Sequence, residues 1–110
     1  KAKDWKGHVA RETALAMNGL PILRCAIAAT FTFYRPRPKS HFGTGRNAAI
    51  LKPSAPTYPI GRPDALKLAR AVEDAMTGVV YSDDALIVRE VLTKFWGEPA
   101  RVEIAIEALA

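Results

Sequence analysis

Acidic residues are missing from a long stretch of this 110-residue chain. None occurs between Thr13 and Pro63, although Lys and Arg are frequent there. Residues 1–63 hold eleven Lys and Arg against two acids, whereas residues 64–110 hold five against nine. A basic half beside an acidic cluster indicates a polyanion held against a metal-binding pocket. Acidic lipid or an acidic protein would satisfy the basic half equally well, but neither explains the carboxylates.

Cysteine and long apolar runs are also scarce. The single Cys25 cannot form an intramolecular disulfide, which favours a reducing cytoplasm and a packed thiol rather than a nucleophile. The most apolar stretch, residues 21–34, is interrupted by Arg24, which excludes a membrane span. The chain starts at Lys1 without a signal-peptide pattern, so we expect a piece with upstream residues missing. Its length and composition suit one domain over residues 1–110.

Two helices are expected from apolar spacing and end signals. The first opens at Asp4 and closes at Asn18-Gly19. The second opens at Asp64, where an acid suits the helix dipole, and ends near Met76. Its apolar face has the spacing i, i+4, i+7, i+8 and consists of Leu68, Val72, Ala75 and Met76. Leu66 falls on the opposite, charged face, where an apolar residue does not fit the pattern.

Strands are expected around these helices. Residues 20–34 alternate with a period of two, and residues 79–81 form a short β-prone run after the second helix. Residues 84–96 favour a strand by β-branching, although helical spacing also fits them. Residues 101–109 alternate as a final antiparallel strand. The sequence therefore predicts an α+β fold with a small, mostly antiparallel sheet and two helices packed on one face.

A long irregular segment, residues 35–62, separates the first strand from the second helix. Its five prolines and three glycines leave little room for regular structure, and a loop of this length is either functional or disordered. Its cations are interleaved with His41, Phe42 and Tyr58, a combination typical of phosphate contact with occasional base stacking. A merely solvated basic loop is the alternative.

Two acidic points flank the second helix. Asp64 opens it, and Asp83 with Asp84 follows the short run after it, about 20 residues later. A helix and a short strand can return the chain to the same place, where the carboxylates would form a cage for a hard divalent cation. By spacing alone, Asp64 is equally an N-cap, and the acidic pair is equally part of a turn.

The stretch RPDALKLARAVEDAMTGVVYSDD, residues 62–84, resembles the signature of the RusA family of Holliday-junction resolvases, especially its phage-type members. The segments FYRPRPKSHFGTGRN and PARVEIAIEAL extend the likeness over nearly the whole chain. The family usually begins with another strand that bears a Pro/Gly-rich segment, which is absent here. The resemblance implies a homodimeric endonuclease that depends on Mg²⁺, or Mn²⁺ in its place, and nicks four-way DNA junctions symmetrically.

The resemblance also assigns roles to individual residues. Asp64 matches the family's first catalytic aspartate, and Asp84 with Asp83 matches the acidic pair, so Asp64 and Asp84 are expected to hold the metal. Arg70 stands where many members have an essential lysine and would stabilise the transition state. Phosphates of the branched DNA would be held without sequence readout by Arg35, Arg37, Lys39, Arg46, Arg62 and Lys67.

Leu66 departs from the family pattern, because the family's second aspartate would fall at this position. Leucine offers neither a metal ligand nor a charge, so affinity for Mg²⁺ and the cleavage rate are expected to fall. One interpretation is a weakened or inactive enzyme that still binds junctions as a homodimer. The other is an enzyme that cleaves usefully because Asp83 or Asp74 compensates. An RNA-binding or ribosome-associated module is a third, more distant alternative.

Overall fold

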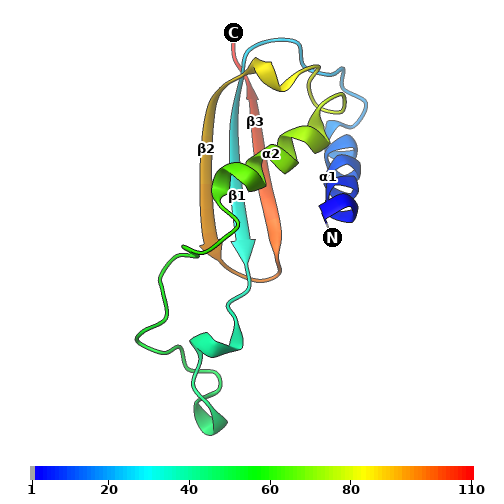
Figure 1. Ribbon diagram of the computed structural model, residues 1–110. Coiled ribbons are helices and arrows are strands. Elements are labelled where there is room, and N and C mark those ends of the chain that lie inside the picture. The colour runs from blue at the N-terminus through cyan, green and yellow to red at the C-terminus, as the bar shows by residue number, and fades with distance from the viewer. Residues whose placement is uncertain (1) are drawn as a thin grey trace.

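The computed structural model describes residues 2–110, with side chains from Trp5 onward (Figure 1). Helix α1 (Ala2–Met17) leads through an irregular segment into strand β1 (Ile27–Arg35). A long connection then reaches helix α2 (Ala65–Met76). Strands β2 (Ile87–Trp96) and β3 (Arg101–Ala108) complete the fold. Short 3-10 turns occupy Lys39–His41, Gly45–Asn47 and Asp84–Leu86. No helix among residues 2–110 combines the length and apolarity needed to span a bilayer.

The sheet has the order β2-β1-β3, with β1 in the centre. β1 pairs with β2 in parallel and with β3 in an antiparallel direction, so the prediction of a mostly antiparallel sheet was wrong. The reason is the connection from β1 to β2, which crosses over through α2 and returns the chain to the end where β1 began. The turn after β2 then passes the end of β1 and places β3 on the far edge (Figure 1).

The core lies between one face of this sheet and the helices, which confirms the predicted α+β class. On β1, the alternating residues Ile27, Ala29, Phe31 and Phe33 are buried. They meet the α2 face that contains Ala69, Val72, Ala75 and Met76. α1 packs against α2 and adds Val9 to the same cluster. Each fully buried large side chain stabilises the fold by about 1.5–3 kcal/mol. Leu66 lies outside this core and is 69% exposed, as its place on the charged face predicts.

Two predicted boundaries in the part of the chain before the arm differ in the structure, namely the starts of α1 and β1. α1 begins at Ala2, ahead of Asp4, whose side chain lies outside the described part. β1 begins at Ile27 rather than at residue 20, because Pro21 has no amide proton and the neighbouring backbone is used elsewhere. The Leu23 amide donates to the Val80 carbonyl at 2.8 Å, and the Leu23 carbonyl accepts from Ser82 at 3.1 Å. Residues 20–26 therefore form an irregular segment rather than a strand.

Two further corrections lie after α2. Residues 79–81 do not form a strand, because Gly78, with a φ of 81°, turns the chain directly after the helix. Val80 and Tyr81 are buried in this turn. β2 begins at Ile87 rather than at residue 84, because Asp84–Leu86 form a 3-10 turn.

The connection between β1 and α2 projects from the body of the protein, and we call its residues 36–61 the arm. Figure 1 shows the arm extending beyond the end of the sheet, and the molecule measures 53 Å along its long axis but only 24 and 20 Å across. A bridge between Phe42 and Leu51 folds the arm back on itself. Its backbone is held by bonds from Gly43 to Ile50 and from Lys52 to His41. The proline-rich segment is thus folded, not a structureless loop.

Side chains from the sheet fix the base of the arm. The indole Nε1 of Trp96 donates to the Pro56 carbonyl at 3.1 Å, and Arg37 Nη1 donates to the same oxygen at 2.9 Å. The Arg37 guanidinium also lies over the Trp96 ring, 5.2 Å from its centroid. The ring of His41 contacts Trp96 edge to face at 5.0 Å. Trp96 at the end of β2 is therefore the main anchor of the arm.

Candidate nucleic-acid interface and acidic sites

Asp64 lies at the junction of the arm with α2. Its backbone is extended, with φ −75° and ψ 159°, as an N-cap requires, but its carboxylate makes no capping hydrogen bond. The carboxylate is instead exposed at a surface pocket of about 630 Å³ lined by Arg62, Pro63, Asp64 and Lys67. The pocket therefore combines one carboxylate with two cations, an arrangement that suits a phosphodiester better than it suits an isolated helix cap.

Polar contacts from the sheet position this pocket. The Lys94 ammonium on β2 donates to the carbonyls of Gly61 at 2.9 Å and Pro63 at 3.1 Å. Arg35, the last residue of β1, donates from Nη1 to the Arg62 carbonyl at 2.8 Å. The segment that carries Arg62 and Asp64 is thus tied to the ends of two neighbouring strands. A rigid attachment of this kind keeps the cations and the carboxylate in fixed relative positions.

Asp83 and Asp84 lie at the other end of α2. Asp64 precedes the helix and Asp84 follows its C-terminal turn, and twelve helical residues span ~18 Å. Asp83 caps the 3-10 turn by accepting a hydrogen bond from the Ala85 amide at 2.9 Å. The alternative that the acidic pair belongs to a turn is thus confirmed for Asp83. The contact with Asp83 raises the pKa of Asp84, because two carboxylates that close cannot easily both ionise. The structure does not bring these acids to Asp64.

The expected cage of carboxylates is consequently not formed within one copy of residues 2–110. Across the described residues, no group of three His, Cys, Asp or Glu side chains is close enough to hold a metal ion. Leu66, the second residue of α2, is exposed and offers no oxygen near Asp64. Asp64 alone does not fit a magnesium site, and the assignment of Asp64 and Asp84 as metal ligands stays a prediction from the resemblance.

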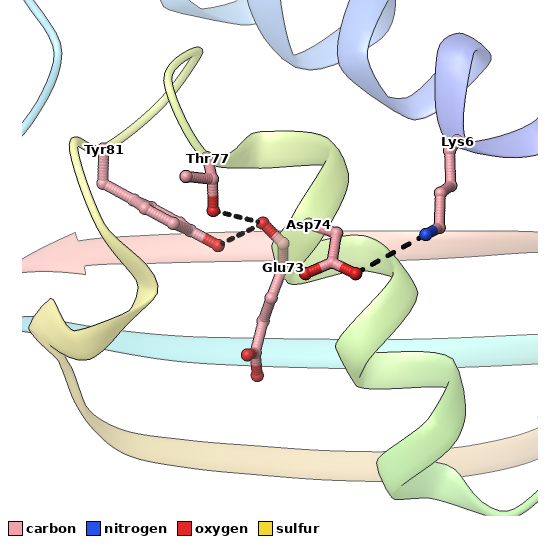
Figure 2. A network of polar contacts seen from close by, with 5 residues as sticks. All are labelled: Lys6, Glu73, Asp74, Thr77 and Tyr81. Carbon is pink, nitrogen blue, oxygen red and sulfur yellow. Dashed lines mark hydrogen bonds and ion pairs between the residues drawn. The ribbon is translucent and has the colours of Figure 1, made fainter.

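A pair of carboxyl groups that the sequence reasoning missed lies between α2 and the sheet. Glu73 on α2 points toward the sheet (Figure 2), and Glu90 of β2 lies close enough to raise the pKa of Glu73. Burial raises the pKa of Glu73 from 4.5 to about 7, and the proximity of Glu90 adds to the effect. Arg70 opposes the rise but does not cancel it.

The surroundings of Glu90 support a shared proton. Its Oε2 atom is buried, and no donor in the described part of the chain reaches it. A protonated Glu73 carboxyl can supply that donor, which is why the neutral form of Glu73 is favoured. Spacing could not reveal this pair, because Glu73 and Glu90 belong to different elements that only the packing of α2 on β2 brings together.

Contacts around the C-terminal turn of α2 are structural (Figure 2). The Glu73 carbonyl accepts from the Tyr81 hydroxyl at 3.0 Å and from the Thr77 hydroxyl at 2.9 Å, which satisfies a carbonyl at the helix end. Asp74 forms an ion pair with Lys6 of α1 at 3.5 Å. Because both partners of that pair are largely exposed, it contributes little to stability.

The six cations expected to contact DNA separate into two groups. Arg35 and Arg37 donate to backbone carbonyls and hold the arm in place. The side chains of Lys39 and Arg46 are exposed on the arm, and those of Arg62 and Lys67 are exposed at the pocket beside Asp64. The exposed group is therefore the part of the predicted set that is free to meet phosphates.

A projecting cationic arm that leads to a carboxylate flanked by two cations is typical of proteins that bind polyanions. The family model for the endodeoxyribonuclease RusA matches residues 1–107, so the chain belongs to the RusA endodeoxyribonuclease family. This family consists of nucleases that act on DNA, which agrees with the resemblance found in residues 62–84.

One curated protein is similar to this chain over its whole length. The uncharacterized protein YqaN of Bacillus subtilis (strain 168) is 27% identical over 117 residues, which cover 100% of this chain and 76% of YqaN. No solved structure matches the chain. The relative therefore supports common ancestry, and the family supplies the functional class.

Proposed function

We propose that this protein is a structure-specific endodeoxyribonuclease of the RusA family that acts on four-way DNA junctions as a homodimer. The observation that carries the proposal is the pocket in which Asp64 lies between Arg62 and Lys67 at the base of the arm. Membership of a family of DNA nucleases makes a DNA phosphate the natural occupant of this pocket.

The arm supports binding of DNA rather than of a small ligand. Lys39 and Arg46 are exposed along it, Arg62 and Lys67 continue the series to Asp64, and no acid interrupts the segment from residue 14 to residue 63. Phosphates spaced along a strand can therefore be met by successive cations, which provides affinity without sequence readout. The pocket at the end of the series would place one phosphodiester beside the Asp64 carboxylate.

Magnesium is expected from the family resemblance, and the residues of one chain do not complete a site for it. Leu66 removes an oxygen ligand two residues after Asp64, and Asp84 lies beyond the far end of α2. These two observations favour a second candidate function, a branched-DNA binding protein that has lost most of its cleavage activity. In both candidates Arg62, Lys67 and the arm bind the DNA backbone in the same way.

The decisive experiment compares the native chain with Leu66→Asp on a synthetic four-way junction, with and without Mg²⁺. We expect both proteins to bind the junction and Leu66→Asp to nick it at least tenfold faster, because the substitution adds a carboxylate two residues after Asp64, where the family pattern has its second aspartate. Cleavage products are resolved on denaturing gels, and binding is measured separately by gel shift in Ca²⁺. Leu66→Asn, which adds an amide without a charge, is the matched control.

The outcomes separate the two candidate functions. Paired nicks by Leu66→Asp alone would identify the native chain as a junction-binding protein with a degenerate cleavage site. Efficient nicking by the native chain, abolished in Asp64→Asn, would establish the nuclease. Failure of every variant to bind or cut junctions would remove the proposal.

A further inference from the structure

The face of the sheet that points away from α2 carries a row of stacked side chains. On β1, Tyr34 alternates with the buried Phe33 and therefore points to this opposite face. Phe95 of β2 lies beside it, with ring centroids 5.8 Å apart. Tyr58 of the arm continues the row, with its centroid 5.9 Å from that of Phe95. On the other side, the Arg101 guanidinium of β3 lies 3.9 Å from the Tyr34 centroid.

The two ends of this row differ in charge and exposure. At the β3 end, Arg101 is paired with Glu103 at 3.1 Å and donates to the Pro99 carbonyl at 3.1 Å, so its charge is already partnered. At the other end, Tyr58 is 53% exposed and belongs to the arm, which carries no acid. Tyr58 is therefore the most exposed ring of the row and the one that lies on the cationic arm.

Tyr58 also differs from the other aromatic residues of the arm. His41 contacts the edge of Trp96, and Phe42 lines a surface pocket with Arg37 and Trp96, so both are less exposed than Tyr58. Tyr58 contacts Phe95 but remains half exposed. Arg62, four residues later, is held next to Arg35 at the end of β1, which places a cation near the same corner of the sheet.

We propose that Tyr58, supported by Phe95 and Tyr34, stacks on an unpaired nucleobase at the branch point of a DNA junction. The inference rests on the proposed function, because the arm must already hold the DNA backbone. An exposed aromatic ring beside cations is the usual platform for unpaired bases, and every base presents a flat face to it. A fully paired duplex offers such a face only at its ends, so the site selects junctions with unpaired bases.

The test compares Tyr58→Leu with Tyr58→Phe on two four-way junctions, one fully paired and one with two unpaired bases at its centre. Leucine keeps apolar bulk against Phe95 but removes the ring, whereas phenylalanine keeps the ring. We expect Tyr58→Leu to weaken binding of the unpaired junction by about 5- to 150-fold and to leave the paired junction unchanged. Tyr58→Phe should bind both junctions as the native protein does.

Ile60→Ala is the matched control, since Ile60 is 84% exposed on the same segment and has no ring. Ile60→Ala should change neither affinity, and circular dichroism should show every variant folded. Unchanged binding of the unpaired junction by Tyr58→Leu, or equal losses on both junctions, would overturn the stacking site but leave the proposed function intact. If the native protein bound neither junction, the proposed function and the stacking site would fail together.

Discussion

The surroundings of a carboxyl group determine its chemical role in this protein. Asp64 stands in the open between Arg62 and Lys67, whereas Glu73 faces Glu90 against the sheet. Burial beside a second carboxyl favours the neutral acid of Glu73, whereas the Asp64 carboxylate is exposed at the surface. Asp64 is thus suited to a role at a phosphodiester, and the pair of Glu73 and Glu90 is suited to holding a proton.

The shared proton predicts how stability depends on pH. Because folding raises the pKa of Glu73 from 4.5 to about 7, the folded state binds more protons than the unfolded state between these values. The stabilisation is complete below pH 4.5 and is lost as the pH rises through about 7. Glu73→Gln, which keeps a donor for Glu90, should be more stable than the native protein at pH 8, by on the order of 1 kcal/mol since Glu73 is only partly buried.

Urea denaturation at pH 5 and pH 8 measures this difference. The free energy of unfolding should depend less on pH in Glu73→Gln than in the native chain. Asp74→Asn serves as the control, because Asp74 is the exposed neighbour that pairs with Lys6 and should leave the pH dependence unchanged. Equal pH dependence in the native chain and Glu73→Gln would show that Glu73 and Glu90 do not share a proton.

Whole elements set which of these groups can meet. α2 presents its apolar face to the core, so Asp64 and the Asp83-Asp84 pair are held at its opposite ends. The arm depends on a different element, the last residue of β2, because Trp96 contacts Pro56, Arg37 and His41. The position of the cations proposed to bind DNA is therefore determined at the end of the sheet rather than within the arm.

Removing this anchor should release the arm. In Trp96→Leu the indole hydrogen bond and the two ring contacts are lost, so transient opening of the arm should increase by about tenfold. Limited trypsin digestion at Lys39 and Arg46 should accelerate to the same extent. Trp5→Leu, the same substitution at the tryptophan of α1, is the control. Equal cleavage rates in the two variants would mean that Trp96 does not anchor the arm.

At the scale of the whole molecule, cations and acids are distributed unevenly over the protein. The arm and the pocket at its base carry exposed cations, while the body carries the acids of α2, β2 and β3. Such a distribution attracts a polyanion to one end of a molecule whose long axis measures 53 Å.

The salt dependence of DNA binding tests this arrangement. Lys39→Gln combined with Arg46→Gln should lower the slope of log affinity against log salt by up to ~1.8, because each lost phosphate contact removes ~0.9. Fluorescence anisotropy with a labelled junction at several NaCl concentrations gives the slope. The control replaces Lys6 and Arg11 of α1 by Gln and should leave the slope unchanged. A slope that falls equally in both double variants would indicate that the arm is not the contact surface.

The sequence by itself determined the features that depend on a few neighbouring residues. Apolar spacing defined α2 and its buried face, alternation defined β3 to within a residue and the end, but not the start, of β1, and Leu66 was correctly placed on the exposed side. The family of the chain was also recognisable, because residues 62–84 carry its signature in a continuous stretch. Each of these is encoded locally, so no knowledge of distant contacts was needed.

Only the tertiary structure decided which distant residues meet. The parallel pairing of β1 with β2, the proximity of Glu73 to Glu90 and the anchoring of the arm on Trp96 all join segments far apart in sequence. Such contacts depend on the packing of whole elements, which local periodicity does not specify.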